Sequence, residues 1–180
     1  ECKNMSKFNR IKDCFSNLKN KKQTALIAFV TAGDPDLATS FKVINALPAA
    51  GVDIIELGMP FSDPMADGPV IQRSYLRSLK AGNSLDKTLN LVRQFRKNNK
   101  KTPLILMGYY NPILQMGIKA FLKKARSCGV DGILIVDLPP DSNNELDIKT
   151  KEEGLDIIRL VTPTSDKDRL NTILKASSGF

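Results

Sequence analysis

A chain of 180 residues, 42% of them hydrophobic, can bury the core of one domain, which excludes wholesale disorder. The formal net charge is +8, but the lysines are scattered over the expected helices without interleaved aromatic residues, so we expect no nucleic-acid partner. No apolar run approaches the roughly 20 residues that span a bilayer, and no secretory signal is visible, so we expect a cytoplasmic protein without membrane contact.

The cysteines and the absence of histidine limit the chemistry that the chain can carry. The chain has an odd number of cysteines, and they are widely spaced: Cys2, Cys14 and Cys128. This pattern is typical of reduced thiols. Without histidine or a CxxC pair we expect no metal site, and any general acid or base must be a carboxylate, lysine, tyrosine or cysteine. We expect Met5 to be the natural start and residues 1–4 to be an upstream extension or an addition to the natural chain.

Hydrophobic periodicity predicts helices and strands in alternation along the whole chain. In chain order, the expected elements are a helix at 6–20, a strand at 25–31, a helix after Asp36 that ends near the helix breaker Pro48, a strand at 53–57, a helix at 70–80, a helix capped by Ser84, a strand at 103–107, a helix at 112–127, a strand at 132–136, a helix at 141–153, a strand at 156–161 and a helix capped by Ser165. Residues 178–180 are expected to begin a sixth strand.

Three similar segments lead into expected strands: AGVDIIEL at 50–57, CGVDGILI at 128–135 and EGLDIIRL at 153–160. In each, glycine follows a helix end, where the chain needs a positive φ angle. The strands that follow are apolar on both faces, which is typical of a parallel sheet covered by helices.

Alternating strands and helices allow either an open doubly wound sheet or a barrel. No G-x-G-x-x-G or Walker loop is present, which disfavours nucleotide binding. Polar loops rich in glycine and proline follow strand after strand, as at the functional rim of a barrel. A whole barrel needs roughly 250 residues. We therefore expect a (β/α)8 TIM barrel that is incomplete here, in which residues 5–180 supply five β/α units and the start of strand six.

The stretch ELGMPFSDPMADGP, residues 56–69, ends a strand with a glutamate and continues into a stiff loop that carries two aspartates. If Glu56 points into a barrel, its semi-apolar surroundings raise its pKa and suit it to proton transfer. The alternative is a strand-end glutamate paired with a lysine or arginine. Asp67, taken alone before Gly-Pro, is most simply a turn residue.

The segments ELGMPFSDPMADGPVIQ, AFVTAGDPD, LMGYYNPI and GVDGILIVDLPP resemble, in this order, the tryptophan synthase alpha subunit family. The resemblance implies a TIM barrel without a cofactor that cleaves indole-3-glycerol phosphate to indole and glyceraldehyde 3-phosphate, a retro-aldol reaction. It also implies an αββα complex with a beta subunit, which holds pyridoxal phosphate and receives indole through a tunnel.

Matched residue by residue, the resemblance makes Glu56 the general acid/base and Asp67 the group that faces the indole N–H. It places four residues in the indole pocket, and each of them could equally be plain barrel core: Phe29, Met107, Tyr109 and Leu134. Pro60 and Asp63 match loop positions that face the beta subunit, although Asp63 could be a turn residue. Asp137 is a candidate only by its position after strand four, where it could equally cap a loop.

The family's phosphate loops and one pocket tyrosine are expected beyond Phe180, so we expect a C-terminally truncated chain that is unstable and nearly inactive alone. Two other classes stay open. One is a non-catalytic protein that only binds a beta subunit, and the other is a different phosphate-sugar barrel enzyme.

Overall fold

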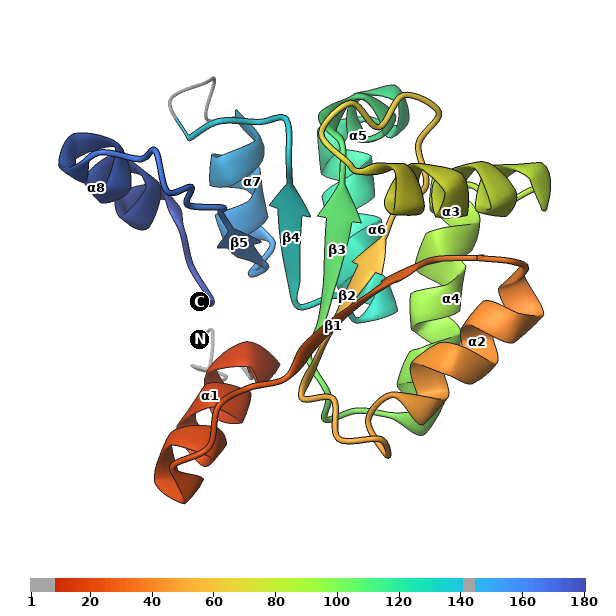
Figure 1. Cartoon of the computed structure of the whole chain (residues 1–180), viewed down its shortest axis with the longest axis horizontal. Helices are drawn as coiled ribbons and strands as arrows, with labels where there is room; N and C mark the ends of the chain where they lie inside the picture. Colours follow the sequence, from red (N-terminus) through yellow and green to blue (C-terminus); the bar gives the residue numbers. More distant parts are fainter. Residues whose placement is uncertain (1–8, 141–144) are drawn as a thin grey trace, which may run out of the picture.

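The computed structural model describes residues 9–140 and 145–180, and within them five strands form one parallel sheet (Figure 1). The strands pair in the order β1-β2-β3-β4-β5, which is also their order along the chain. Their bounds are β1 (Ile27–Thr31), β2 (Ile54–Gly58), β3 (Leu104–Gly108), β4 (Gly132–Ile135) and β5 (Asp156–Ile158). An open doubly wound sheet would reverse this order at a switch point. The unbroken order is that of a β/α barrel, so the expected fold class is confirmed.

Helices follow or precede every strand within the described residues, and none of them is long and apolar enough to cross a membrane. Their bounds are α1 (Arg10–Lys21), α2 (Leu37–Ala46), α3 (Pro69–Lys80), α4 (Leu85–Asn98), α5 (Tyr110–Met116), α6 (Ile118–Cys128), α7 (Glu145–Glu152) and α8 (Lys167–Ala176). Residues 6–8 and 141–144 of two expected helices lie outside the described residues, as do Cys2 and Met5.

Two expected helix features are wrong. The single helix over 112–127 is two helices, because Gly117 lies between α5 and α6 with a φ of 85° that a helix cannot hold. Ser165 does not cap the last helix, because Asp166 accepts the backbone N–H of Arg169 at 2.7 Å and begins α8. The expected cap Ser84 is confirmed, because its side chain accepts the backbone N–H of Lys87. Asp36, after which a helix was expected, caps that helix by accepting the backbone N–H of Thr39.

The expected turns before three strands are confirmed by positive φ angles at Gly51, Gly129 and Gly154. In the first two of these segments, the aspartate two residues after the glycine ties neighbouring strands together. Asp53 Oδ2 accepts the N–H of Leu26 at 2.8 Å, just before β1, and Asp131 Oδ2 accepts the N–H of Leu104 at 2.9 Å. In these two segments the Gly-x-Asp pattern therefore fixes both the turn and the strand entry.

The sheet separates two hydrophobic clusters. One packs the sheet against its covering helices and includes Ile55, Leu57 and Phe121. The other is the interior cluster, formed by Ile11, Ile54, Ile105, Leu134 and Ile158, with Met107 and Val136 packed against it. Because strand residues alternate between faces, membership in these clusters tells which side chains point into the barrel.

Helix α1 lies at the amino-terminal end of the strands, while α3, α5 and the loop 59–68 lie at the carboxyl end (Figure 1). Phe15 of α1 packs against Phe180, with ring centroids 5.4 Å apart. Residues 178–180 form no strand, but the N–H of Ser178 donates to the carbonyl of Ile157 at 2.8 Å, which places this segment beside β5.

Candidate functional site

Glu56 lies on β2 and points to the interior face, because Ile54 belongs to the interior cluster and both Ile55 and Leu57 to the opposite one. It is half-buried, and its strand neighbours are Phe29 and Ile105. Burial raises the pKa of the Glu56 carboxyl above its ordinary value of 4.5. Among the described residues Glu56 has no ion pair, so the alternative of a strand-end glutamate neutralised by a lysine or arginine is not observed.

Asp67 lies on the loop between β2 and α3, at the carboxyl end of the strands. Its Oδ2 accepts the hydroxyl proton of Tyr109 at 2.7 Å, and its backbone carbonyl accepts the side-chain amide of Gln72 at 2.8 Å. The Asp67 N–H donates to the carbonyl of Pro64, so the turn expected here is present as well. Asp67 is therefore a turn residue whose carboxylate is also held by a buried tyrosine.

Tyr109, expected only as a pocket residue, anchors the whole loop 59–68. Its ring packs on Phe61 with centroids 5.3 Å apart, and its hydroxyl accepts the N–H of Ala66 at 2.9 Å while donating to Asp67. Burial first, and then the hydrogen bond to Asp67, raise the pKa of Tyr109 to about 12, so the phenol stays a donor at neutral pH.

The four residues matched to an indole pocket do not all lie in one layer. Phe29, Met107 and Leu134 are on the interior face with Glu56, since Met107 and Leu134 belong to or pack on the interior cluster and Ala28 and Val30 point away from it. Tyr109 lies one step further along, at the rim. Together these side chains form an apolar surface beside the Glu56 carboxyl, and the Asp67 carboxyl lies at the carboxyl end of the strands above that surface.

The remaining candidates differ in exposure. Pro60 is buried in this chain, whereas Asp63 is exposed and accepts a hydrogen bond from the Ser62 hydroxyl. Asp137 Oδ1 accepts the N–H of Tyr110 at 2.9 Å, at the first residue of α5. The structure thus gives Asp137 the loop-capping role that was one of its two interpretations.

Tyr75 is a residue of this region that the sequence analysis missed. It lies on α3 with no exposed surface, and its hydroxyl has no hydrogen-bond partner among the described residues. Its ring lies at the carboxyl end of β2: a Cβ on Gly58 would come within 3.2 Å of the Tyr75 ring and 2.6 Å of the Phe29 ring. The only sequence signal was a tyrosine on the helix that directly follows the carboxylate loop.

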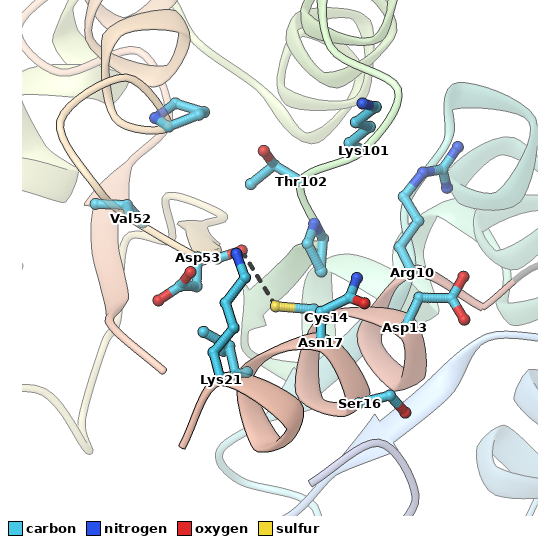
Figure 2. A pocket seen from close by; sticks show the side chains of 13 residues that line it. Arg10, Asp13, Cys14, Ser16, Asn17, Lys21, Val52, Asp53, Lys101 and Thr102 are labelled. Carbon is cyan, nitrogen blue, oxygen red and sulfur yellow. Dashed lines mark hydrogen bonds between the residues drawn. The ribbon is translucent and has the colours of Figure 1, made fainter. Parts of the chain in front are cut away.

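A cavity of about 620 Å³ opens at the other end of the strands, between α1 and the segments that precede β2 and β3 (Figure 2). Figure 2 shows Cys14 of α1 pointing toward Asp53, whose backbone carbonyl accepts the thiol proton at a Sγ–O distance of 3.8 Å. Burial and then the Asp53 charge raise the pKa of the Cys14 thiol. This cavity holds neither Glu56 nor Asp67 and lies at the opposite end of the sheet from them.

Similar proteins were found by sequence and by structure. The sequence model of the family described as "Tryptophan synthase alpha chain" matches residues 15–180. The alpha chain of Legionella pneumophila subsp. pneumophila is 41% identical with a TM-score of 0.92, over 96% of this chain and 65% of that chain. A chain of the M. tuberculosis tryptophan synthase in its aminoacrylate-bound form is 34% identical with a TM-score of 0.90, over 96% of this chain and 70% of that one.

A chain of the tryptophan synthase complex from Pyrococcus furiosus is 42% identical with a TM-score of 0.82, over 86% of this chain and 63% of that one. The present chain thus covers 65% of the Legionella alpha chain, which is just under two-thirds of its length. The family match, the identities and the shared barrel order agree, and the chain belongs to the tryptophan synthase alpha chain family.

Proposed function

We propose that the protein carrying this chain cleaves indole-3-glycerol phosphate to indole and glyceraldehyde 3-phosphate, a carbon–carbon lyase step of tryptophan biosynthesis in the cytoplasm. The observation that carries the proposal is the half-buried Glu56 carboxyl, which points into the barrel and has no ion pair within residues 9–140 and 145–180, while Asp67 lies on the loop that follows it. Membership in the family supports the choice of substrate.

The reaction needs a group that first gives and then takes a proton. Protonation of indole C3 makes that carbon tetrahedral and weakens its bond to the side chain. The side-chain carbon bonded to C3 carries a hydroxyl. When this hydroxyl loses its proton, its carbon becomes the carbonyl of glyceraldehyde 3-phosphate, and the electron pair of the broken C–C bond restores the indole ring. A carboxyl with a raised pKa suits both tasks, so Glu56 donates to C3, takes the hydroxyl proton and ends as it began.

The second carboxylate stabilises the charge that this protonation creates. Once C3 is protonated, positive charge resides on the ring nitrogen, whose N–H becomes a stronger donor. Asp67 faces that N–H in this proposal, and the Tyr109 hydroxyl at 2.7 Å from Oδ2 keeps the carboxylate oriented. Phe29, Met107 and Leu134 supply the apolar walls against which the indole ring packs.

The chain uses no cofactor in this proposal, and its partner is a beta chain in an αββα complex. Pyridoxal phosphate belongs to that beta chain, which receives the indole through a tunnel. The loop that carries Pro60 and Asp63 is the surface that meets it, with Asp63 as the exposed contact and buried Pro60 as the residue that fixes the loop. The M. tuberculosis and Pyrococcus relatives, described as tryptophan synthase and tryptophan synthase complex, support this partnership.

The substrate's phosphate is held, by the family resemblance, by loops after the later strands. In this proposal those loops and a further pocket tyrosine belong to the part of the relatives' length that this chain does not span, about a third of the Legionella alpha chain. Residues 5–180 are, in this proposal, the N-terminal part of one barrel domain, and the proton-transfer groups described above all belong to it.

The decisive assay follows indole and glyceraldehyde 3-phosphate release from indole-3-glycerol phosphate, using the protein at the length of its relatives with its beta chain. Formation of both products in equal amounts supports the lyase. Stable association with the beta chain without indole release would indicate the binding-only protein instead. Turnover of another sugar phosphate, with neither indole release nor association with the beta chain, would place the protein among other barrel enzymes.

A further inference from the structure

Among the described residues, Tyr75 lies close to the carboxylates and has a polar group without a task in the reaction described above. Its side chain is fully buried, and its hydroxyl lacks a hydrogen-bond partner within the described residues. Most buried polar groups in folded proteins are paired, because an unpaired hydroxyl costs roughly 1–3 kcal/mol. A buried tyrosine hydroxyl without a hydrogen-bond partner is therefore a candidate for a functional role.

The helix that carries Tyr75 is fixed to the end of β1. Ser74, beside Tyr75, shares a hydrogen bond of 2.6 Å with Thr31, and Ser78 donates to the carbonyl of Ala32 at 2.6 Å. Arg77 adds two hydrogen bonds of 2.7 Å to Asp34. The Tyr75 ring is held as well, against the strand end at Gly58 and next to Phe29. The tyrosine is thus a fixed donor, and only a group that moves toward it can accept its proton.

The group best placed to do so is the carboxylate of Asp67. The loop that carries Asp67 starts directly after Gly58, against which the Tyr75 ring packs, and ends directly before α3, the helix that carries Tyr75. Burial first, and then the charge of Asp67 and the Tyr109 phenol, raise the pKa of Tyr75, in keeping with this placement. The Asp67 carboxylate accepts a hydrogen bond through Oδ2, while its Oδ1 has no donor among the described residues. Its loop is exposed at Asp63 and Met65, which leaves room for the carboxylate to shift.

We propose that Tyr75 is a positioning residue for Asp67: its hydroxyl donates to the Asp67 carboxylate when that carboxylate turns to the substrate. One carboxylate oxygen then faces the ring N–H while phenol donors hold the other. Tyr75 touches no reacting atom and acts only through Asp67. This inference rests on the proposed lyase function, since it assigns Tyr75 to the same carboxylate.

The test compares Tyr75→Phe with the wild-type protein at the length of its relatives, in complex with its beta chain, on indole-3-glycerol phosphate. Phenylalanine keeps the ring and removes only the hydroxyl. We expect kcat to fall about tenfold, as for the loss of one hydrogen bond to a charged group, with KM changed less than twofold. The melting temperature should stay the same or rise, because no partnered group is lost.

A double-mutant cycle separates positioning from a merely structural role. In an Asp67→Asn background, Tyr75→Phe should cost less than twofold in kcat, because the group through which Tyr75 acts is gone. Tyr110→Phe is the matched control, since Tyr110 lies on α5 outside the described site, and it should leave kcat unchanged. Two results would overturn the inference about Tyr75 and leave the lyase proposal standing. One is an equal kcat for wild type and Tyr75→Phe, and the other is a full tenfold loss of kcat on Tyr75→Phe in the Asp67→Asn background. A wild-type protein that releases no indole overturns the lyase proposal and this inference with it.

Discussion

At the scale of single residues, the proposed reaction depends on two carboxyl groups in different surroundings. Glu56 is half-buried on an apolar face and meets no counter-charge in the described part of the chain, whereas Asp67 accepts a hydrogen bond from Tyr109. The position of Glu56 could be predicted because a strand-end residue and a two-residue alternation are local properties. The role of Tyr109 could not, since its hydroxyl meets Asp67 across 42 positions of sequence, and such a contact depends on the folded loop.

The raised pKa of Glu56 predicts a pH-dependent cost in stability. The folded state keeps the Glu56 proton to higher pH than the unfolded state does, so the free energy of unfolding falls as pH rises from 4.5 through the raised pKa. Glu56→Gln removes this dependence and should therefore be more stable than wild type at pH 8 and indistinguishable from it at pH 4. Urea unfolding at both pH values measures the difference. The exposed Glu152→Gln serves as the control, and a Glu56→Gln protein less stable at pH 8 would refute the burial argument.

Tyr109→Phe should damage the loop and the reaction together. The substitution removes the donor to Asp67 and also the acceptor for the Ala66 N–H, while keeping the ring stacked on Phe61. We expect a loss of about 1–3 kcal/mol in stability from the groups left unpaired, and a fall in kcat/KM of at least tenfold. Chemical denaturation and steady-state kinetics check the two effects. Unchanged values in both would show that the loop does not depend on this hydroxyl.

At the scale of elements, buried ion pairs join the pieces of the barrel at its amino-terminal end. Asp131, just before β4, accepts from Arg10 of α1 at 2.8 Å and from Arg96 of α4 at 2.7 Å, and its side chain is 5% exposed. Arg96 also donates to the carbonyls of Gly129 and Thr102. Its desolvation lowers the pKa of Arg96 to about 10, with Asp131 opposing the shift. One aspartate thus connects two helices to a strand.

Breaking this cluster should be far more costly than breaking a surface pair. Asp131→Asn leaves the Arg96 guanidinium buried without its counter-charge, and we expect a loss of about 3–5 kcal/mol. The control is Asp86→Asn, which breaks the pair with Lys124 where Asp86 is 57% exposed and should cost at most about 1 kcal/mol. Equal costs for the two variants in urea unfolding would contradict the assigned role of Asp131.

Element boundaries show where prediction from sequence stops. The cap residue Ser84 and the turn glycines were predictable because each acts within a few residues. The break at Gly117 was missed because a single glycine within an apolar periodicity is also compatible with a continuous helix. The last strand is shorter than expected, at Asp156–Ile158, because hydrophobicity beyond it does not guarantee a neighbour to pair with.

At the scale of the whole molecule, the sheet has two open sides within the described residues. β1 pairs only with β2, and β5 only with β4, whereas a closed barrel has no edge strand. Apolar side chains near these edges are exposed, with Leu26 at 53% and Leu160 at 57%. The local elements are those of a β/α barrel, but no strand among the described residues covers these two edges.

A polypeptide of residues 1–180 expressed by itself should therefore self-associate. Open strand edges and exposed apolar surface favour pairing between copies, so sedimentation should show species larger than a monomer at micromolar concentration. The same protein at the length of its relatives is the control and should not expose these edges. A monodisperse monomer of residues 1–180 with one cooperative melting transition would contradict this expectation.

The central claim is that Glu56 transfers the protons of the cleavage reaction. It is tested most directly by single-turnover cleavage of indole-3-glycerol phosphate, with wild type and Glu56→Gln compared at the length of the relatives and with the beta chain bound. A positioned acid/base contributes roughly 10²–10⁴-fold, so the variant should cleave slower by that factor while still binding substrate. A cleavage rate within about threefold of wild type would contradict the account, because the proton would then have to come from another group.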